Sequence, residues 1–192
     1  MTPLIENPEG FQCIPNWQTF ASHQRRSATG CIPTGYEILL RAAGATGIDF
    51  ATFQDEFDLE RPEVRTSELR NNFGSVADAV VARYPYVRFA ERVFDDGAEK
   101  VRAIDDLVAA GQPCLISLAL SPGGGWHIML VVGTSPDELL LLNRLDADGT
   151  AVLTRASKIN VAWRHDNWRG GKEIATLEQW QDDGPTLSRH QA

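Results

Sequence analysis

The sequence predicts an α+β domain, with a helical first part followed by an antiparallel sheet. Amphipathic helical patterns cover 32–43 and 98–111 in the first part. After residue 112 the pattern changes to short apolar runs, "PCLISLAL", "WHIMLVVGT" and "ELLLLNRL", separated by "SPGGG" and "SPD". Apolar runs between turn-forming residues are typical of central strands. We therefore expect a single domain over 1–192 whose C-terminal part is the sheet.

The helix expected at 32–43 is the first strong element. Its apolar residues recur at helical spacing and form one broad face: Ile32, Tyr36, Leu39, Leu40 and Ala43. A proline suits a first helical turn and a glycine commonly follows a helix end, which fits Pro33 and Gly44. We expect this helix to be buried.

The remaining segments complete the expected architecture. Residues 1–20 predict an irregular N-terminal arm, and 50–83 predict helical pieces. A strand is expected at 86–93 because polar and apolar residues alternate there. The runs "TAVLTRA" and "INVAWRHD" predict two more strands, 173–181 a helix, and 182–192 a flexible tail.

Composition limits the function classes. The chain has 192 residues, 43% of them hydrophobic, and a net charge of −8. An acidic protein of this kind is not expected to bind nucleic acid, which requires a basic face. The sequence shows neither an apolar stretch of membrane-spanning length nor a signal-peptide pattern, so we expect no membrane span. The expected location is the cytoplasm, or export by a route without a signal peptide.

The three cysteines are Cys13, Cys31 and Cys114. They are widely spaced and contain no CxxC pair, which argues against a disulfide framework and against a zinc site. The motif "DADGT" lacks the glycine and glutamate that a calcium loop requires. We expect no metal and no cofactor, and a reducing compartment.

Cys31 stands directly before the buried helix. Backbone N–H groups converge at a helix N-terminus, and the positive end of the helix dipole favours a thiolate there. The sequence thus predicts a lowered thiol pKa and a nucleophilic sulfur. When the sulfur attacks a carbonyl, the Cys31 N–H would stabilise the oxyanion that develops on the carbonyl oxygen. The alternative is a small hydrophobic residue at a helix end.

A base and its partner lie in the sheet half. His127 opens the run "IMLVV" after a glycine loop, and Asn143 ends the next run. If "TSPD" closes a hairpin, the antiparallel return brings Asn143 beside His127. The amide oxygen would accept from one imidazole nitrogen and leave the other to face Cys31. The alternatives are a half-buried histidine bonded to a loop carbonyl and a polar residue at a strand end.

This order of cysteine, histidine and asparagine resembles the papain-like cysteine peptidase superfamily. The nearest likeness is to its compact bacterial branch, the C39-like bacteriocin-leader peptidases and their stand-alone relatives. That branch opens with Cys-Gly-Pro where this chain has "CIP" at 31–33, and the 16-residue step from His127 to Asn143 is similar to papain's. The resemblance covers roughly 20–145. Ile32 replaces the usual glycine, and Leu145 stands where papain-type enzymes carry a tryptophan.

The resemblance implies a papain-like fold in which the nucleophile begins a central helix packed on the sheet. It also implies a thiol hydrolase, a cysteine peptidase with a Cys31–His127–Asn143 triad that acts on a protein or peptide through an acyl-enzyme. In the family a glutamine before the cysteine supplies an oxyanion-hole amide, which matches Gln24 best and Gln18 less well.

The glycine loop before His127 would let substrate backbone pass close to the histidine, so Gly124, Gly125 and Trp126 are the expected substrate-binding residues. Two alternatives remain. The same triad could serve acyl transfer, transglutamination or glutamine deamidation in a bacterial effector, or the fold could be a non-catalytic binding module. The sequence makes no prediction of oligomeric state.

Overall fold

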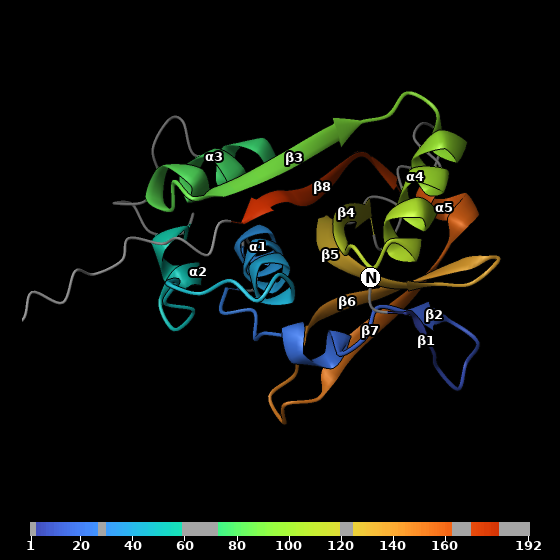
Figure 1. Ribbon diagram of the computed structural model, residues 1–192, viewed down its shortest axis with the longest axis horizontal. Helices are drawn as coiled ribbons and strands as arrows, with labels where there is room; N and C mark the ends of the chain where they lie inside the picture. Colours follow the sequence, from blue (N-terminus) through green and yellow to red (C-terminus); the bar gives the residue numbers. More distant parts are fainter. Residues whose placement is uncertain (1–2, 27–29, 59–72, 120–124, 163–169, 181–192) are drawn as a thin grey trace, which may run out of the picture.

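The computed structural model describes residues 3–26, 30–58, 73–119, 125–162 and 170–180. They form an α+β fold in which an antiparallel sheet lies between helices, so the predicted class is confirmed (Figure 1). The elements are β1 (Ile5–Glu6), β2 (Gln12–Cys13), the 3₁₀ helix η1 (Trp17–Phe20), α1 (Cys31–Ala42), α2 (Phe53–Glu56), α3 (Phe73–Arg83), β3 (Val87–Val93), α4 (Gly97–Ala109), β4 (Cys114–Ala119), β5 (Trp126–Thr134), β6 (Glu138–Leu145), β7 (Ala151–Ser157), α5 (Lys158–Ala162) and β8 (Gly170–Trp180).

Strand β5 is the centre of the sheet. It pairs with β4 along one edge and with β6 along the other, and both pairings include Leu130 and Val131. The sheet continues from β4 to β8 and β3, and from β6 to β7. In Figure 1, β4 and β5 lie between α1 and α4, and both helices contact β5. The middle of the sheet is therefore buried on both faces.

The β5–β6 hairpin places the start of β5 near the end of β6. Its turn is closed by the N–H of Ser135, which donates to the carbonyl of Glu138 at 2.9 Å. The antiparallel register pairs Thr134 with Leu139 and Leu130 with Leu142. This hairpin was predicted from "TSPD", and its register brings Asn143 back toward His127.

Helix α1 is the buried helix that the apolar pattern predicted. All of its first ten residues are buried, and the helix packs against β5. Gly44, which follows it, has a φ of 68°, a left-handed conformation that glycine adopts without steric cost. The N–H of Ala45 then donates to the carbonyl of Leu40 at 3.0 Å and closes the helix end.

Two predictions near the C-terminus were wrong. Residues 158–162 form the helix α5 where a strand was predicted, and 170–180 form β8 where a helix was predicted. The segment "KEIATLEQW" fits either period locally, but pairing with β3 and β4 on its two sides buries Ile174 and Ala175. Tertiary pairing of this kind overrides local preference. Residues 163–166 of the predicted strand and the predicted tail at 182–192 lie outside the described residues.

The N-terminal arm differs from the prediction as well. Within 1–20, the short strands β1 and β2 pair with each other, and β2 pairs with the end of β5. Buried Phe11 and Cys13 explain this order, because they contribute apolar surface to the main core. The other predicted elements are confirmed: helical pieces at α2 and α3, the strand β3, the helix α4, and the strands β4 to β7.

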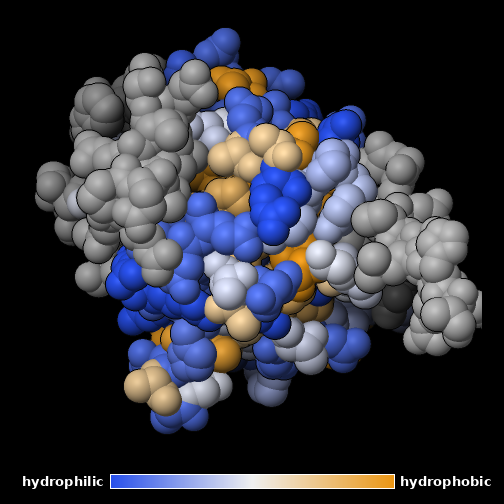
Figure 2. Space-filling model, turned by 90° about the vertical axis from the view of Figure 1, so that its left-hand side faces the viewer, coloured by the Kyte–Doolittle hydropathy of each residue, from blue (hydrophilic) through white to orange (hydrophobic). Residues whose placement is uncertain are grey.

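The surface is largely polar on the side where α2 and α3 lie. Figure 2 shows that hydrophilic residues cover most of the described part of this face, with hydrophobic residues in small separate groups. Among the described residues, the large hydrophobic side chains that are exposed stand on five different elements: Ile5, Val93, Trp126, Leu153 and Ile159. None of the described helices has the length and apolar character that crossing a membrane requires.

Candidate active site

Cys31 is the first residue of α1, and its exposed fraction is only 9%. Directly before it, the N–H of Gly30 donates to the carbonyl of Arg26 at 3.2 Å. A Cβ on Gly30 would lie 2.4 Å from that carbonyl oxygen, so a side chain does not fit there. The glycine before the cysteine therefore allows the backbone of Arg26 to approach the start of α1 closely.

Backbone amides and burial act in opposite directions on the pKa of the Cys31 thiol. Hydrogen bonds from the backbone of Ile128, Ile32 and Cys31 itself lower the thiol pKa, but burial raises it by more, so the pKa lies above its ordinary value. The prediction that the helix mouth lowers this pKa is therefore wrong, because a sequence pattern does not show how far the packed sheet removes the sulfur from water. At neutral pH the sulfur keeps its proton unless a base takes it.

The Ile128 contact places Cys31 beside strand β5. The amide that reaches the sulfur belongs to the peptide joining His127 to Ile128. One helical turn further along α1, a Cβ on Gly35 would lie 3.2 Å from Ile128 Cγ2. The helix that begins at Cys31 therefore packs closely against the strand that begins beside His127.

His127 and Asn143 are in direct contact. His127 Nε2 lies 2.7 Å from Asn143 Oδ1 across the β5–β6 hairpin, and both side chains are half-buried. An amide oxygen only accepts hydrogen bonds, so Nε2 is the donor, and in the neutral ring Nδ1 then keeps the lone pair. Asn143 thus selects the tautomer in which the remaining ring nitrogen can act as a base.

Gln24 belongs to a loop that runs beside the end of β6. The N–H of Leu145 donates to the carbonyl of Ser22 at 2.8 Å, and His23 forms a parallel bridge with Leu145. The half-buried Gln24 donates from Nε2 to the carbonyl of Arg26 at 2.7 Å. This loop lies close to the end of β6, the strand that carries Asn143.

Gln18 lies at the other end of α1. It is exposed on η1, whose Thr19 and Phe20 line a cavity of about 450 Å³ together with Ala42 and Gly44. At about 1.5 Å per residue, the length of α1 separates Ala42 from Cys31 by roughly 17 Å. Of the two glutamines, the geometry therefore favours Gln24 as a neighbour of the thiol.

The residues expected to contact substrate precede His127. Gly124 lies outside the described residues. Gly125 and Trp126 are exposed, and Trp126 pairs with Ala119, the last residue of β4. Trp126 has 44% of its surface exposed directly beside the half-buried histidine.

Comparison with known proteins identifies the fold. No family model matches the sequence, and no curated protein matches it. Among solved structures, the fold is similar to that of a protein from Bacillus anthracis that is provisionally described as a C39-like peptidase, with a TM-score of 0.56 and 15% sequence identity. The match covers 88% of this chain and 99% of that chain. The chain has a papain-like fold of the C39-like type.

The C39-like fold contains a buried polar cluster that the sequence analysis missed. Glu37 has 1% of its surface exposed and lies between buried Tyr36 and Ile38, and Gln54 has 4% exposed. The two side chains meet at 2.6 Å, where Gln54 Nε2 donates to Glu37 Oε2. A charged residue inside an otherwise buried helix was the available signal, because such a residue needs a partner.

A second polar group is buried on the far side of the sheet. Lys100 of α4 is fully buried and donates to the carbonyl of Gly171 at 2.6 Å. Burial lowers the pKa of Lys100 to about 8. Among the described residues, no three histidine, cysteine, aspartate or glutamate side chains are grouped so that they could hold a metal ion.

Proposed function

We propose that this chain is a papain-like cysteine peptidase in which Cys31 is the nucleophile, His127 the base and Asn143 the residue that orients the base. One observation carries the proposal. His127 Nε2 lies 2.7 Å from Asn143 Oδ1, and the backbone amide of the next residue, Ile128, acts on the Cys31 thiol and lowers its pKa. A thiol, an imidazole with a free Nδ1 and an orienting amide are the parts that acyl transfer to sulfur requires.

The first half-reaction forms an acyl-enzyme. His127 Nδ1 takes the Cys31 proton, which is necessary because burial raises the pKa of this thiol. The sulfur bonds to the carbonyl carbon, and the carbonyl π electrons move onto oxygen. The Cys31 N–H and the Gln24 amide stabilise this oxyanion. When the oxyanion collapses, the carbon–nitrogen bond breaks, and the imidazolium protonates the leaving amine.

The second half-reaction releases the acid. His127 Nδ1 takes a proton from water, whose oxygen bonds to the thioester carbonyl carbon. Collapse of the second oxyanion breaks the carbon–sulfur bond, and the imidazolium returns its proton to the sulfur. The enzyme ends in its starting protonation state.

The substrate would approach along the N-terminal end of β5, where Gly125 and Trp126 lie. A Cβ on Gly125 would meet no other atom within 4 Å, so this position leaves space for a passing chain. The exposed indole of Trp126 offers an apolar surface next to His127. These features fit an extended protein or peptide substrate.

A proteome-derived peptide library tests the proposal. The protein is incubated with the library, and mass spectrometry records new fragments. We expect cleavage by the wild type, complete loss in Cys31→Ala, and normal cleavage in the matched control Cys13→Ala, since Cys13 packs against Gly133 at the far end of β5.

The same spectra separate the other uses of the triad. Amine adducts indicate transglutamination or acyl transfer, and a shift of about one dalton indicates glutamine deamidation; either result without cleavage overturns the peptidase assignment. No Cys31-dependent mass change would leave a non-catalytic binding module as the explanation and would overturn the proposal.

A further inference from the structure

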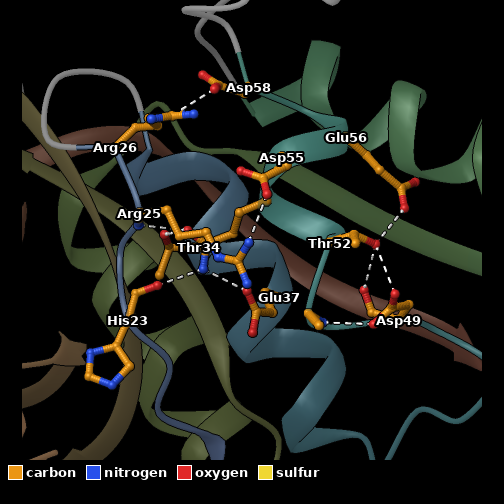
Figure 3. Close-up of polar contacts among 12 residues, drawn as sticks. His23, Arg25, Arg26, Thr34, Glu37, Asp49, Thr52, Asp55, Glu56 and Asp58 are labelled. Atoms are coloured by element: carbon orange, nitrogen blue, oxygen red, sulfur yellow. Dashed lines mark hydrogen bonds and ion pairs between the residues drawn. The ribbon is translucent and has the colours of Figure 1, made fainter.

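We propose that Gln54 is a positioning residue that holds Gln24 in the orientation needed to stabilise the oxyanion. The inference rests on the proposed function, because it gives a catalytic purpose to a buried polar cluster. The cluster consists of Ser22, Thr34, Glu37, Arg41 and Gln54 (Figure 3 labels Thr34 and Glu37 of this cluster, with His23, Arg25 and Arg26 of the neighbouring loop).

The amide of Gln54 binds the backbone on both sides of Gln24. Its Nε2 donates to the carbonyl of His23 at 2.7 Å, and its Oε1 accepts from the N–H of Arg25 at 3.0 Å. In a parallel sheet, the backbone of one residue binds the carbonyl before and the N–H after a residue on the neighbouring strand. The Gln54 side chain makes the same two hydrogen bonds around Gln24. Both peptide planes that flank Gln24 are therefore fixed.

The same loop is held from its other side by β6. Ser22 accepts from Leu145 through its carbonyl at 2.8 Å, and His23 bridges to Leu145 in parallel. Leu145 lies two residues beyond Asn143 on the same strand. The loop that carries Gln24 is thus clamped between Gln54 and the strand of the proposed triad.

Helix α1 fixes the orientation of Gln54. Gln54 Nε2 donates to Glu37 Oε2 at 2.6 Å, and the Thr34 hydroxyl lies 2.9 Å from Gln54 Oε1. That hydroxyl also lies 2.6 Å from the carbonyl oxygen of Gly30, so its single hydrogen is shared between two acceptors. Because Gln54 is 4% exposed, an inverted amide would bury unmatched donors and acceptors.

Glu37 anchors the cluster to the helix. Its Oε1 accepts from the Ser22 hydroxyl at 2.7 Å and from Arg41 at 2.8 Å. Thr34 and Glu37 are the third and sixth residues after Cys31 on the same helix. The sulfur and the loop that carries Gln24 are therefore built on one rigid frame.

Two ion pairs hold the loop from the α2 side. Arg25 pairs with Asp55 at 2.8 Å, and Arg26 pairs with the buried Asp58 at 2.7 Å. The carbonyl of Arg26 is the group that accepts from Gln24 Nε2. An oxyanion donor contributes most when its position is set before the reaction, because no reorganisation is then needed in the transition state. The hydrogen bonds and ion pairs that hold the backbone on both sides of Gln24 would set the position of its amide in this way.

A double-mutant cycle tests the inference. The substrate is the library peptide that the wild type cleaves fastest. We expect Gln24→Ala to lower kcat about 100-fold, which is the usual effect of losing one oxyanion donor. Gln54→Met keeps the size of the side chain and removes its hydrogen bonds, and we expect it to lower kcat at least 10-fold with little change in KM. In the Gln24→Ala background, Gln54→Met should have no further effect on kcat.

Gln112→Met is the matched control. Gln112 is half-buried and, like Gln54, donates from Nε2 to a backbone carbonyl, in this case that of Leu177, away from the loop. We expect it to leave kcat unchanged. Hydrogen exchange should show faster exchange of the Arg25 N–H in Gln54→Met and not in Gln112→Met, because that amide loses its acceptor.

The outcomes separate this inference from the proposed function. If the wild type has no Cys31-dependent turnover, the proposed function fails and takes the inference with it. If turnover is present and Gln54→Met lowers kcat by the same factor with and without Gln24, then Gln54 acts on the general fold and this inference alone fails. Unchanged kcat or unchanged Arg25 exchange in Gln54→Met overturns it as well.

Discussion

Gly35 of α1 meets Ile128 of β5 at a distance that leaves little room for a side chain. A Cβ at Gly35 would lie 3.2 Å from Ile128 Cγ2 and 3.2 Å from Leu115 Cδ2. This contact sets the separation between the helix that begins at Cys31 and the strand that carries His127. The spacing of the proposed nucleophile and base therefore depends on a buried glycine in the helix.

Gly35→Val should move α1 away from the sheet. The added methyl groups overpack a closed contact, which typically costs about 1–3 kcal/mol of the free energy of unfolding. We also expect kcat to fall by about 100-fold, because an error of about 1 Å between reacting groups has that effect. Urea unfolding and kinetics on the cleaved library peptide measure the two effects, with Gly125→Ala as the stability control. A valine variant with wild-type kcat would show that this contact does not set the geometry.

Asn143→Ala should lower kcat without unfolding the protein. The substitution removes the acceptor 2.7 Å from His127 Nε2 and frees the ring to rotate and to change tautomer. We expect a loss of about 100-fold in kcat. Asn143→Asp keeps an acceptor at this position and should retain much more activity than Asn143→Ala. Equal activities of the two variants would mean that the hydrogen bond has no role in the reaction.

The three free cysteines should react with iodoacetamide in a fixed order. Cys31, at 9% exposed, should be labelled first, and Cys114, fully buried, last, since burial raises the pKa of Cys114 to about 12. Because burial also raises the pKa of Cys31, its labelling rate should still be increasing above pH 8.5, where an ordinary thiol is half ionised. Peptide mass spectrometry at several pH values gives these rates. A rate for Cys31 that is constant from pH 6 upward would show a thiolate in the resting protein.

Lys100 should make stability depend on pH in the alkaline range. Its pKa is about 8 in the fold and 10.5 when unperturbed, so between these values the unfolded chain binds more protons. The free energy of unfolding contributed by this group therefore rises with pH over that range. Relative to Lys100→Met, the wild type should gain about 1 kcal/mol between pH 7 and pH 9.

Comparing the two proteins cancels the titration of most other groups. Urea unfolding at the two pH values measures the difference. A constant difference would mean that the buried amine titrates alike in both states.

The sequence was sufficient for the parts of the site that depend on local geometry. The helix at Cys31 follows from its apolar period, and the contact between His127 and Asn143 follows from a short turn that fixes the hairpin register. Both are set by neighbouring residues, so a pattern in the chain reveals them.

The parts that the sequence did not reveal depend on tertiary packing. Gln54 forms hydrogen bonds with Glu37, 17 residues before it, and with His23, 31 residues before it. No local sequence pattern predicts contacts between residues so far apart in the chain. The raised pKa of Cys31 results from desolvation by the assembled core. Strand β8 was predicted as a helix because its apolar residues fit both the helical and the strand spacing. Only its pairing with β3 and β4 decides in favour of a strand.

Trapping the acyl-enzyme tests the central claim most directly. The protein is mixed with the library peptide that it cleaves, quenched in acid within one turnover, and analysed by intact and peptide mass spectrometry. The account predicts an adduct with the mass of the acyl fragment on Cys31, present in Cys13→Ala and absent from Cys31→Ala. An acyl adduct on another residue, or peptide cleavage by Cys31→Ala, would contradict it.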